Sequence, residues 1–383
     1  MVYYFLRFHR FILNIIVPKH FIFKLLEKIK NQENLNNEKH KSSYLNYNSI
    51  CTFANKNKSL NLGMKTKLTS LIILLFIVVS CNTDCTVNKD ISNIPMDVEV
   101  VRFDKAFAEA TTEDLPQLKT AFPELFSSRV PDSIWVNKIN DTLQNELESE
   151  VIKTFPDFIE ETNDISTLFK HIKYHFPEFK KPTVITVTSD VDYRNKVIVA
   201  DRLLLIALDN YLGTDHRFYV GIQEYLKDNF RKAQIVPNIA QEYANQLVPR
   251  PTSRTFLAQM VYYGKLLYLQ DVFLPCTNPN EKIGYSKEDY QWALDNEEQI
   301  WRYFIEKELI YKTSNKLQER FINEGPFSKF YLQLDAESPS KLGQYIGWQI
   351  VKQYMDKHPV SLKKLLITDA ETIFKTSKYK PKK

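Results

Sequence analysis

The segments PTVITVTSD (residues 182–190) and NKVIVA (residues 195–200) carry the clearest β-sheet pattern in this 383-residue chain. Both are rich in β-branched residues and the residues between them have a turn-like composition, so the two segments are expected to form a pair of strands. A brief strand-like alternation also precedes them, at residues 98–101. Around these segments the apolar residues follow helical spacing, up to about Phe179 and again after Asp201. The sequence therefore predicts a predominantly helical α+β fold with a small sheet near residues 183–200.

The helical stretch before the sheet is divided by Phe-Pro pairs, which begin at Phe122, Phe155 and Phe176. The residue before a proline is disfavoured in the α region, so each pair predicts the end of a helix. An array of short helices is expected here.

A helix is predicted directly after the sheet, and its sequence NIAQEYANQL (residues 238–247) has the frame of the zinc-protease signature H-E-x-x-H. Gln241 and Asn245 stand where the two histidines would be, and Glu242 stands at the place of the catalytic glutamate. Residues four apart project from one face of a helix, which is why this spacing suits a metal. A neutral amide offers only a carbonyl oxygen, a poor zinc ligand compared with imidazole. The helix thus has the geometry of a metal site without its chemistry.

The third position of such a site leads to the same interpretation. In glutamate-type zincins a second helix supplies a glutamate just before a glycine, and the nearest match here is YYGKLLYL (residues 262–269), with Tyr263 at the glutamate's place. Gln241, Asn245 and Tyr263 are interpreted as remnant ligand positions and Glu242 as a remnant general base, with no metal and no cofactor expected. The alternative is an ordinary amphipathic helix that matches the motif by chance. The predicted buried face comprises Val236, Ile239, Ala240, Tyr243 and Leu247.

A lipoprotein signal peptide is predicted at residues 64–80, MKTKLTSLIILLFIVVS. It has two lysines, an apolar run too short for a comfortable membrane span, and Ser80 directly before Cys81. This layout resembles a bacterial lipobox, in which the cysteine is acylated with fatty acids such as palmitate and becomes the mature N-terminus. Residues 1–63 are interpreted as a spurious N-terminal extension, residues 81–90 as a lipidated tether and residues 91–383 as a single domain. The alternative is an ordinary N-terminal anchor helix.

Removing residues 1–80 changes the net charge of the chain from positive to negative. The sequence carries 51 basic and 46 acidic residues, but residues 1–80 hold 12 of the basic and three of the acidic ones, so the remainder has a net charge of −4. A nucleic-acid partner is therefore not expected. Beyond Cys81 the sequence contains only Cys85 and Cys276. Two cysteines so far apart predict neither a set of disulfides nor a metal site, although an oxidising compartment would permit a disulfide between them.

Two features near the C-terminus also carry predictions. Gly343 and Gly347 lie four residues apart in an apolar helical segment, which indicates close packing against another helix. The ending SKYKPKK (residues 377–383) is interpreted as a solvated basic tail, with a contact to an acidic partner or an anionic lipid surface as the alternative.

Four segments resemble the GldB family of gliding-motility lipoproteins of Bacteroidetes. They are SDVDYRNKVIVADRLLLIALDNYLG (residues 189–213), RPTSRTFLAQMVYYGKLLYLQDVFLP (residues 250–275), ERFINEGPFSKFYLQLDAESPSKLGQYIGWQIVKQYM (residues 319–355) and the ending SKYKPKK. The resemblance extends from the lipobox to the last residue. It implies a lipoprotein of the cell envelope that is required for gliding, a motility tied to type IX secretion, and it carries no established catalytic residues.

The family is also distantly similar to predicted zinc-dependent proteases with intact H-E-x-x-H helices. The resemblance therefore implies a zincin-like domain that has lost its metal and acts as a structural or accessory protein, with other gliding and secretion proteins as partners. The chain is expected outside the cytoplasm, attached to a membrane through Cys81. Two alternatives remain: an active zinc metallopeptidase with unusual ligands and Glu242 as its base, or an envelope module that binds peptide or glycan.

Overall fold

The computed structural model of the chain describes residues 88–333 and 335–382. The predicted N-terminal extension, signal peptide and lipidation site Cys81, together with most of the tether, lie outside the described residues.

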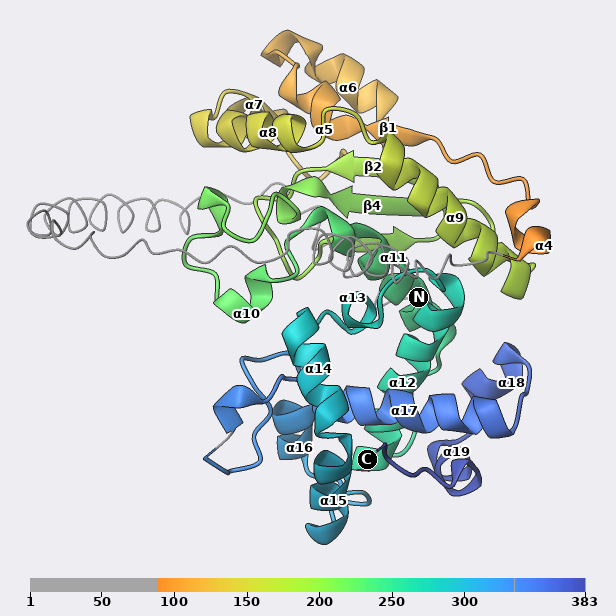
Figure 1. Cartoon of the computed structure of the whole chain (residues 1–383). Coiled ribbons are helices and arrows are strands. Elements are labelled where there is room, and N and C mark those ends of the chain that lie inside the picture. The colour runs from red at the N-terminus through yellow and green to blue at the C-terminus, as the bar shows by residue number, and fades with distance from the viewer. Residues whose placement is uncertain (1–87, 334, 383) are drawn as a thin grey trace, which may run out of the picture. The chain divides into compact units, whose positions relative to one another are not determined.

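The described residues form many helices and one sheet (Figure 1). The helices of the N-terminal half are α4 (Lys89–Ser92), α5 (Phe103–Ala108), α6 (Leu115–Ala121), α7 (Asp132–Ile139), α8 (Thr142–Thr154), α9 (Ile159–His175), α10 (Glu224–Lys227) and α11 (Ile235–Leu247). Those of the C-terminal half are α12 (Phe256–Phe273), α13 (Pro279–Ile283), α14 (Lys287–Asp295), α15 (Glu297–Glu306), α16 (Asn315–Phe321), α17 (Leu342–Lys357), α18 (Leu362–Ile367) and α19 (Ala370–Ser377). The strands are β1 (Val100–Arg102), β2 (Thr183–Val187), β3 (Val197–Ala200) and β4 (Leu203–Ala207).

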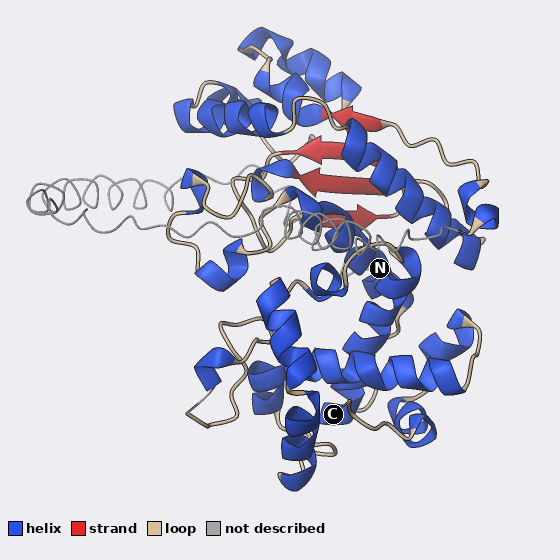
Figure 2. Ribbon diagram, viewed as in Figure 1, coloured by secondary structure: helices blue, strands red, loops and turns tan. Residues whose placement is uncertain are grey.

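The four-stranded sheet has the order β1-β2-β4-β3. Strands β1, β2 and β4 run parallel, and β3 pairs antiparallel with β4 at the edge. Within residues 88–382 the strands drawn lie together in one half, and the other half is built of helices (Figure 2). The predicted fold class, a mostly helical α+β protein with a small sheet, is confirmed.

The pairing of the strands differs from the sequence prediction. The predicted pair, β2 and β3, does not pair directly, because β4 lies between them. Residues 203–207, predicted to be helical, form this central strand, and a tight turn with Asp201 at φ 47° joins it to β3. A strand buried on both faces has a continuous apolar run without alternation, so LLLIA looks the same as a segment of a buried helix.

Both faces of the sheet are covered by helices. Alternate residues of a strand point to opposite faces. Val184 and Leu204 belong to a core shared with α9 and α11, whereas Ile185 and Leu205 belong to a second core shared with α5, α6 and α7. The sheet therefore forms the middle layer of three. The short helices on these faces end as predicted, since Phe122, Phe155 and Phe176 are the C-cap residues of α6, α8 and α9.

The C-terminal helices enclose a third core around α12 and α17. Helix α12 contributes Tyr262 and Leu266 to the sheet core and Met260 and Leu267 to the helical core, so it joins the two halves. Most of its residues are buried, which explains why apolar residues occur on every side of this helix.

The basic ending is held against the domain, so the prediction of a solvated tail is wrong for its first part. Ser377 is fully buried and Tyr379 is only 8% exposed. Lys357 Nζ donates a hydrogen bond to the carbonyl oxygen of Ser377 (2.7 Å), and the backbone N–H of Lys380 donates to the side-chain oxygen of Gln353 (2.9 Å). Among the described helices, none is both long enough and apolar enough to cross a membrane.

Candidate binding cavity beside the motif helix

Helix α11 buries one face and presents a polar face, as its sequence pattern predicts. Ile239, Ala240 and Tyr243 are buried in the core that α11 shares with the sheet, and Val236 and Leu247 pack partly buried against it. The helix lies against the edge strand β3, where the side-chain amide of Gln246 donates a hydrogen bond to the carbonyl oxygen of Val199 (3.0 Å).

The two amides at the histidine positions are joined in a chain of hydrogen bonds, which we call the amide chain (Gln270, Gln241, Asn245). Gln270, a fully buried residue of α12, donates from its Nε2 to Gln241 Oε1 (2.6 Å). Gln241 Nε2 donates in turn to Asn245 Oδ1 (3.3 Å). Each carbonyl oxygen that would have to face a metal already accepts a hydrogen bond from a neighbouring amide.

The residues at the motif positions therefore do not fit zinc. A zinc site of this type needs three charged or imidazole ligands with a free lone pair, and Gln241 and Asn245 are neutral amides whose oxygens are engaged. Within the described ranges, no group of three or more His, Cys, Asp or Glu residues is arranged to hold a metal ion.

Glu242, the predicted remnant base, lies on the side of α11 near Tyr211. Burial above all, together with the nearby carboxylates of Glu242 and Asp209, raises the pKa of the Tyr211 hydroxyl. Tyr211 accepts a hydrogen bond from the side chain of Asn238, one turn before Glu242 (2.9 Å). Glu242 is not among the residues that line the cavity described next.

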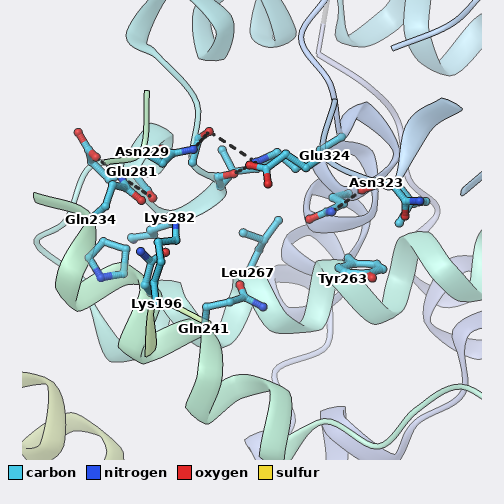
Figure 3. A pocket seen from close by; sticks show the side chains of 17 residues that line it. Lys196, Asn229, Gln234, Gln241, Tyr263, Leu267, Glu281, Lys282, Asn323 and Glu324 are labelled. Atoms are coloured by element: carbon cyan, nitrogen blue, oxygen red, sulfur yellow. Dashed lines mark hydrogen bonds and ion pairs between the residues drawn. The ribbon is translucent and has the colours of Figure 1, made fainter. Parts of the chain in front are cut away.

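A cavity of about 390 Å³ opens beside the polar face of α11 (Figure 3). Gln241 and Tyr263 both line it, so two of the four predicted positions meet in one site. Asn245 is bonded to Gln241 but does not line the cavity. The remaining wall comes from segments far apart in sequence, including Lys196 before β3, Asn229, Glu324 and Lys341 before α17.

The charged groups of this wall were not found from the sequence. Lys196 directly precedes the β-branched run of β3, and Lys341 directly precedes α17, but no local pattern shows that both face one cavity. Burial lowers the pKa of the Lys196 ammonium to about 8, against the opposing effect of Glu324. Burial likewise lowers the pKa of Lys341, whose Nζ donates a hydrogen bond to the carbonyl oxygen of Ile283 (2.7 Å).

A second polar cluster lies beyond the end of β2. Asp209, fully buried, accepts hydrogen bonds from the backbone N–H groups of Ser189 (2.9 Å) and Val191 (2.6 Å). These bonds hold Asp190 and Val191 at φ 56° and 58°, in the left-handed region that a β-branched residue rarely adopts. The hydrogen bonds to Asp209 thus fix the loop between β2 and β3.

Glu148 of α8 lies in the same region, and its burial makes the stability of the fold depend on pH. It is 2% exposed and accepts a hydrogen bond from the side-chain amide of Gln144. Burial raises the pKa of the Glu148 carboxyl from its ordinary 4.5 to about 7, partly offset by Gln144 and Lys138. Because the folded state holds this proton more tightly than the unfolded chain, the stability that the proton provides is present below about pH 4.5 and is lost as the pH rises towards 7.

Glu148→Gln is therefore expected to stabilise the protein by roughly 2–3 kcal/mol at pH 8 and to have little effect near pH 4.5. The neutral amide keeps the hydrogen bond to Gln144 and carries no charge that burial would penalise. Urea unfolding of both proteins across this pH range measures the difference. A constant difference at all pH values would contradict a titrating Glu148.

Cys276 is the one cysteine among the described residues, and it is disulfide-bonded. An oxidising compartment is compatible with this bond.

Fold and site together define a mostly helical α+β protein with a polar, lysine-lined cavity beside a helix whose metal-ligand positions carry amides. A family model described as gliding motility protein GldB matches residues 84–381, and the chain belongs to this family. The resemblance found in the four sequence segments is thereby confirmed. Membership identifies a gliding motility protein of a lipoprotein family. No curated protein and no solved structure matches the chain.

Proposed function

We propose that the chain is a lipid-anchored accessory component of the gliding apparatus in the cell envelope and that it acts by binding, without catalysis. The observation that carries this proposal is the amide chain: Gln241 and Asn245 have their carbonyl oxygens engaged by neighbouring amides at the places where a protease would hold its metal. A general base without a metal-bound water has no nucleophile to activate in this type of site. Family membership supports the role in gliding.

A zincin-like origin of the fold belongs to the same proposal. It is supported by a mixed sheet that precedes the motif helix, by the position of α11 against the antiparallel edge strand β3, and by Tyr263 of α12 lining the same cavity as Gln241. We propose that other envelope proteins of gliding and type IX secretion are the partners, and that the lipid on Cys81 holds the domain at the membrane.

Gliding itself tests the absence of catalysis. A strain that carries Glu242→Gln in place of the native gene is expected to spread on agar as fast as the parent, because no step uses the carboxylate as a base. Gln241→Trp is the matched variant one residue away; its bulky ring enters the cavity and breaks the amide chain, so spreading is expected to fall. Immunoblots of both strains control for protein level. Loss of spreading in Glu242→Gln at a normal protein level would contradict the proposal.

The metallopeptidase alternative makes an opposite prediction for metal content. The full chain, purified from membranes without chelator and incubated with zinc, is expected to retain no stoichiometric zinc on elemental mass spectrometry. Zinc near one ion per chain that is lost in Tyr263→Phe would favour the peptidase. A binding module is the second candidate, and the cavity beside α11 favours it over an inert scaffold, since a scaffold needs no polar cavity.

A further inference from the structure

We propose that the cavity beside α11 binds a carboxylate, held between Lys196 and Lys341, and that the natural ligand is the carboxyl-terminal end of a polypeptide. This inference deepens the proposed accessory role and rests on it for its biological setting.

Lys196 supplies a cation that the protein itself does not neutralise. Its ammonium lies over the ring of Phe230, 5.2 Å from the centroid, and has no hydrogen-bond acceptor or ion-pair partner among the described residues. Lys196 is half-buried, and an ammonium that is partly removed from water without an acceptor is costly unless another group compensates it. An anion in the cavity would provide that compensation.

Lys341 and Asn229 line the cavity close to Gly284. Lys341 Nζ donates a short hydrogen bond to the carbonyl oxygen of Ile283 and a long one to that of Gly284 (3.5 Å), which leaves one of its three protons for a ligand. Asn229 is 7% exposed; its Nδ2 donates to the carbonyl oxygen of Gly284 (3.2 Å), and its buried Oδ1 has no partner. The wall thus offers positive charge for an anion and, beside it, an acceptor that requires a donor.

The charge balance selects a single negative charge. The charged residues that line the cavity sum to a net charge of +1: Lys196, Lys282, Lys341, Glu281 and Glu324. Glu281 is paired with Arg231 (2.7 Å), Lys282 with Asp271 (2.9 Å) and Lys341 with Glu324 (3.9 Å). Lys196 is therefore the lining cation that has no ion-pair partner among the described residues. A carboxylate balances this charge, whereas a phosphate dianion would leave an excess of negative charge next to Glu324.

The start of α17 adds to the attraction for an anion. Lys341 is its N-cap residue, no side chain caps the helix, and Gln344 in its first turn also lines the cavity. The positive end of a 16-residue helix favours a negative charge at this place. This contribution supports the lysines and would not define a site without them.

The end of a peptide chain supplies both required groups. Its α-carboxylate can lie between the two ammonium groups, and the N–H of the same residue can donate to Asn229 Oδ1. Side-chain amides of Gln241 and Asn323 line the cavity for the preceding peptide group, and Leu267 and Ile322 provide apolar contact for a side chain. An acidic sugar shares the carboxylate but presents hydroxyl groups in place of the peptide.

Calorimetric titration of the full chain in detergent tests the proposal without any variant. N-acetyl-alanyl-alanine with a free carboxylate is expected to bind, and the same dipeptide with a carboxyl-terminal amide is expected to bind at least about ten-fold more weakly, because the charged hydrogen bonds are lost. Equal binding of acid and amide, or no binding of either, would overturn the site. Binding of galacturonate without binding of the dipeptide acid would overturn the peptide assignment.

Variants locate the site. Lys196→Met keeps the length of the side chain and removes its charge. This variant is expected to bind the dipeptide acid about ten-fold more weakly, or weaker still. Lys316→Met on the exposed surface of α16 is the matched control and should leave affinity unchanged. Unchanged affinity in Lys196→Met would remove Lys196 from the site and overturn the proposal. If the dipeptide does not bind and Glu242→Gln still glides, the carboxylate site fails while the accessory role stands.

Discussion

Gly347→Ala is expected to lower the free energy of unfolding by about 4 kcal/mol or more. Gly347 lies in α17 where this helix crosses α12, and a Cβ atom at this position would overlap the carbonyl group of Met260. A Cβ at Gly264 of α12 would overlap the carbonyl group of Gly347 itself. The obstructing atoms are backbone atoms, which cannot rotate away, so the two helices would have to separate and open the core that they share. Urea unfolding followed by tryptophan fluorescence measures the loss.

Gly325→Ala is the matched control for this substitution. The atom nearest to a Cβ at Gly325 is 4.0 Å away, and its backbone does not require a left-handed conformation. Its stability is expected to stay within about 0.5 kcal/mol of the parent. If Gly347→Ala proved as harmless as Gly325→Ala, the close crossing of α12 and α17 would be refuted.

The close crossing was predictable because its signal is local. Two glycines four residues apart in an apolar helix indicate a narrow face, whatever the partner is. The helix ends at Phe122, Phe155 and Phe176 were predictable for the same reason, since the proline after each of them acts on its own neighbour. Where the physical cause lies within a few residues, the sequence pattern is sufficient.

The order of the strands and most of the cavity were not predictable in this way. Strand β4 pairs with both β2 and β3. An apolar sequence such as LLLIA does not indicate which strands it will pair with. The polar face of α11 led to Gln241, but Lys196, Asn229 and Lys341 reach the same cavity from distant segments. The packing of α12 against α11 on one side and against α17 on the other brings them together.

The second large loss of stability is expected from a substitution of Glu297, which holds the C-terminal ending in place. Glu297→Ala is expected to lower the free energy of unfolding by about 4 kcal/mol, because it leaves two buried hydroxyl groups and one partly buried backbone N–H without this acceptor. Glu297 is 2% exposed and begins α15. It accepts hydrogen bonds from the hydroxyl groups of Tyr345 (2.8 Å) and Tyr379 (2.8 Å) and from the backbone N–H of Lys382 (3.0 Å). One carboxylate thus joins α15 and α17 to the end of the chain.

The adjacent Glu298 provides the control for this prediction. It is partly exposed and pairs with Arg302 on the same helix (2.8 Å), an interaction of at most about 0.5 kcal/mol. Glu298→Ala should therefore unfold at nearly the urea concentration of the parent, whereas Glu297→Ala should unfold much earlier. Limited proteolysis should also cleave residues 378–382 faster in Glu297→Ala alone, since Tyr379 is released from its buried position. Equal unfolding and equal cleavage of the two variants would mean that the ending is not held by Glu297, and the solvated tail predicted from its charge would then be the better description.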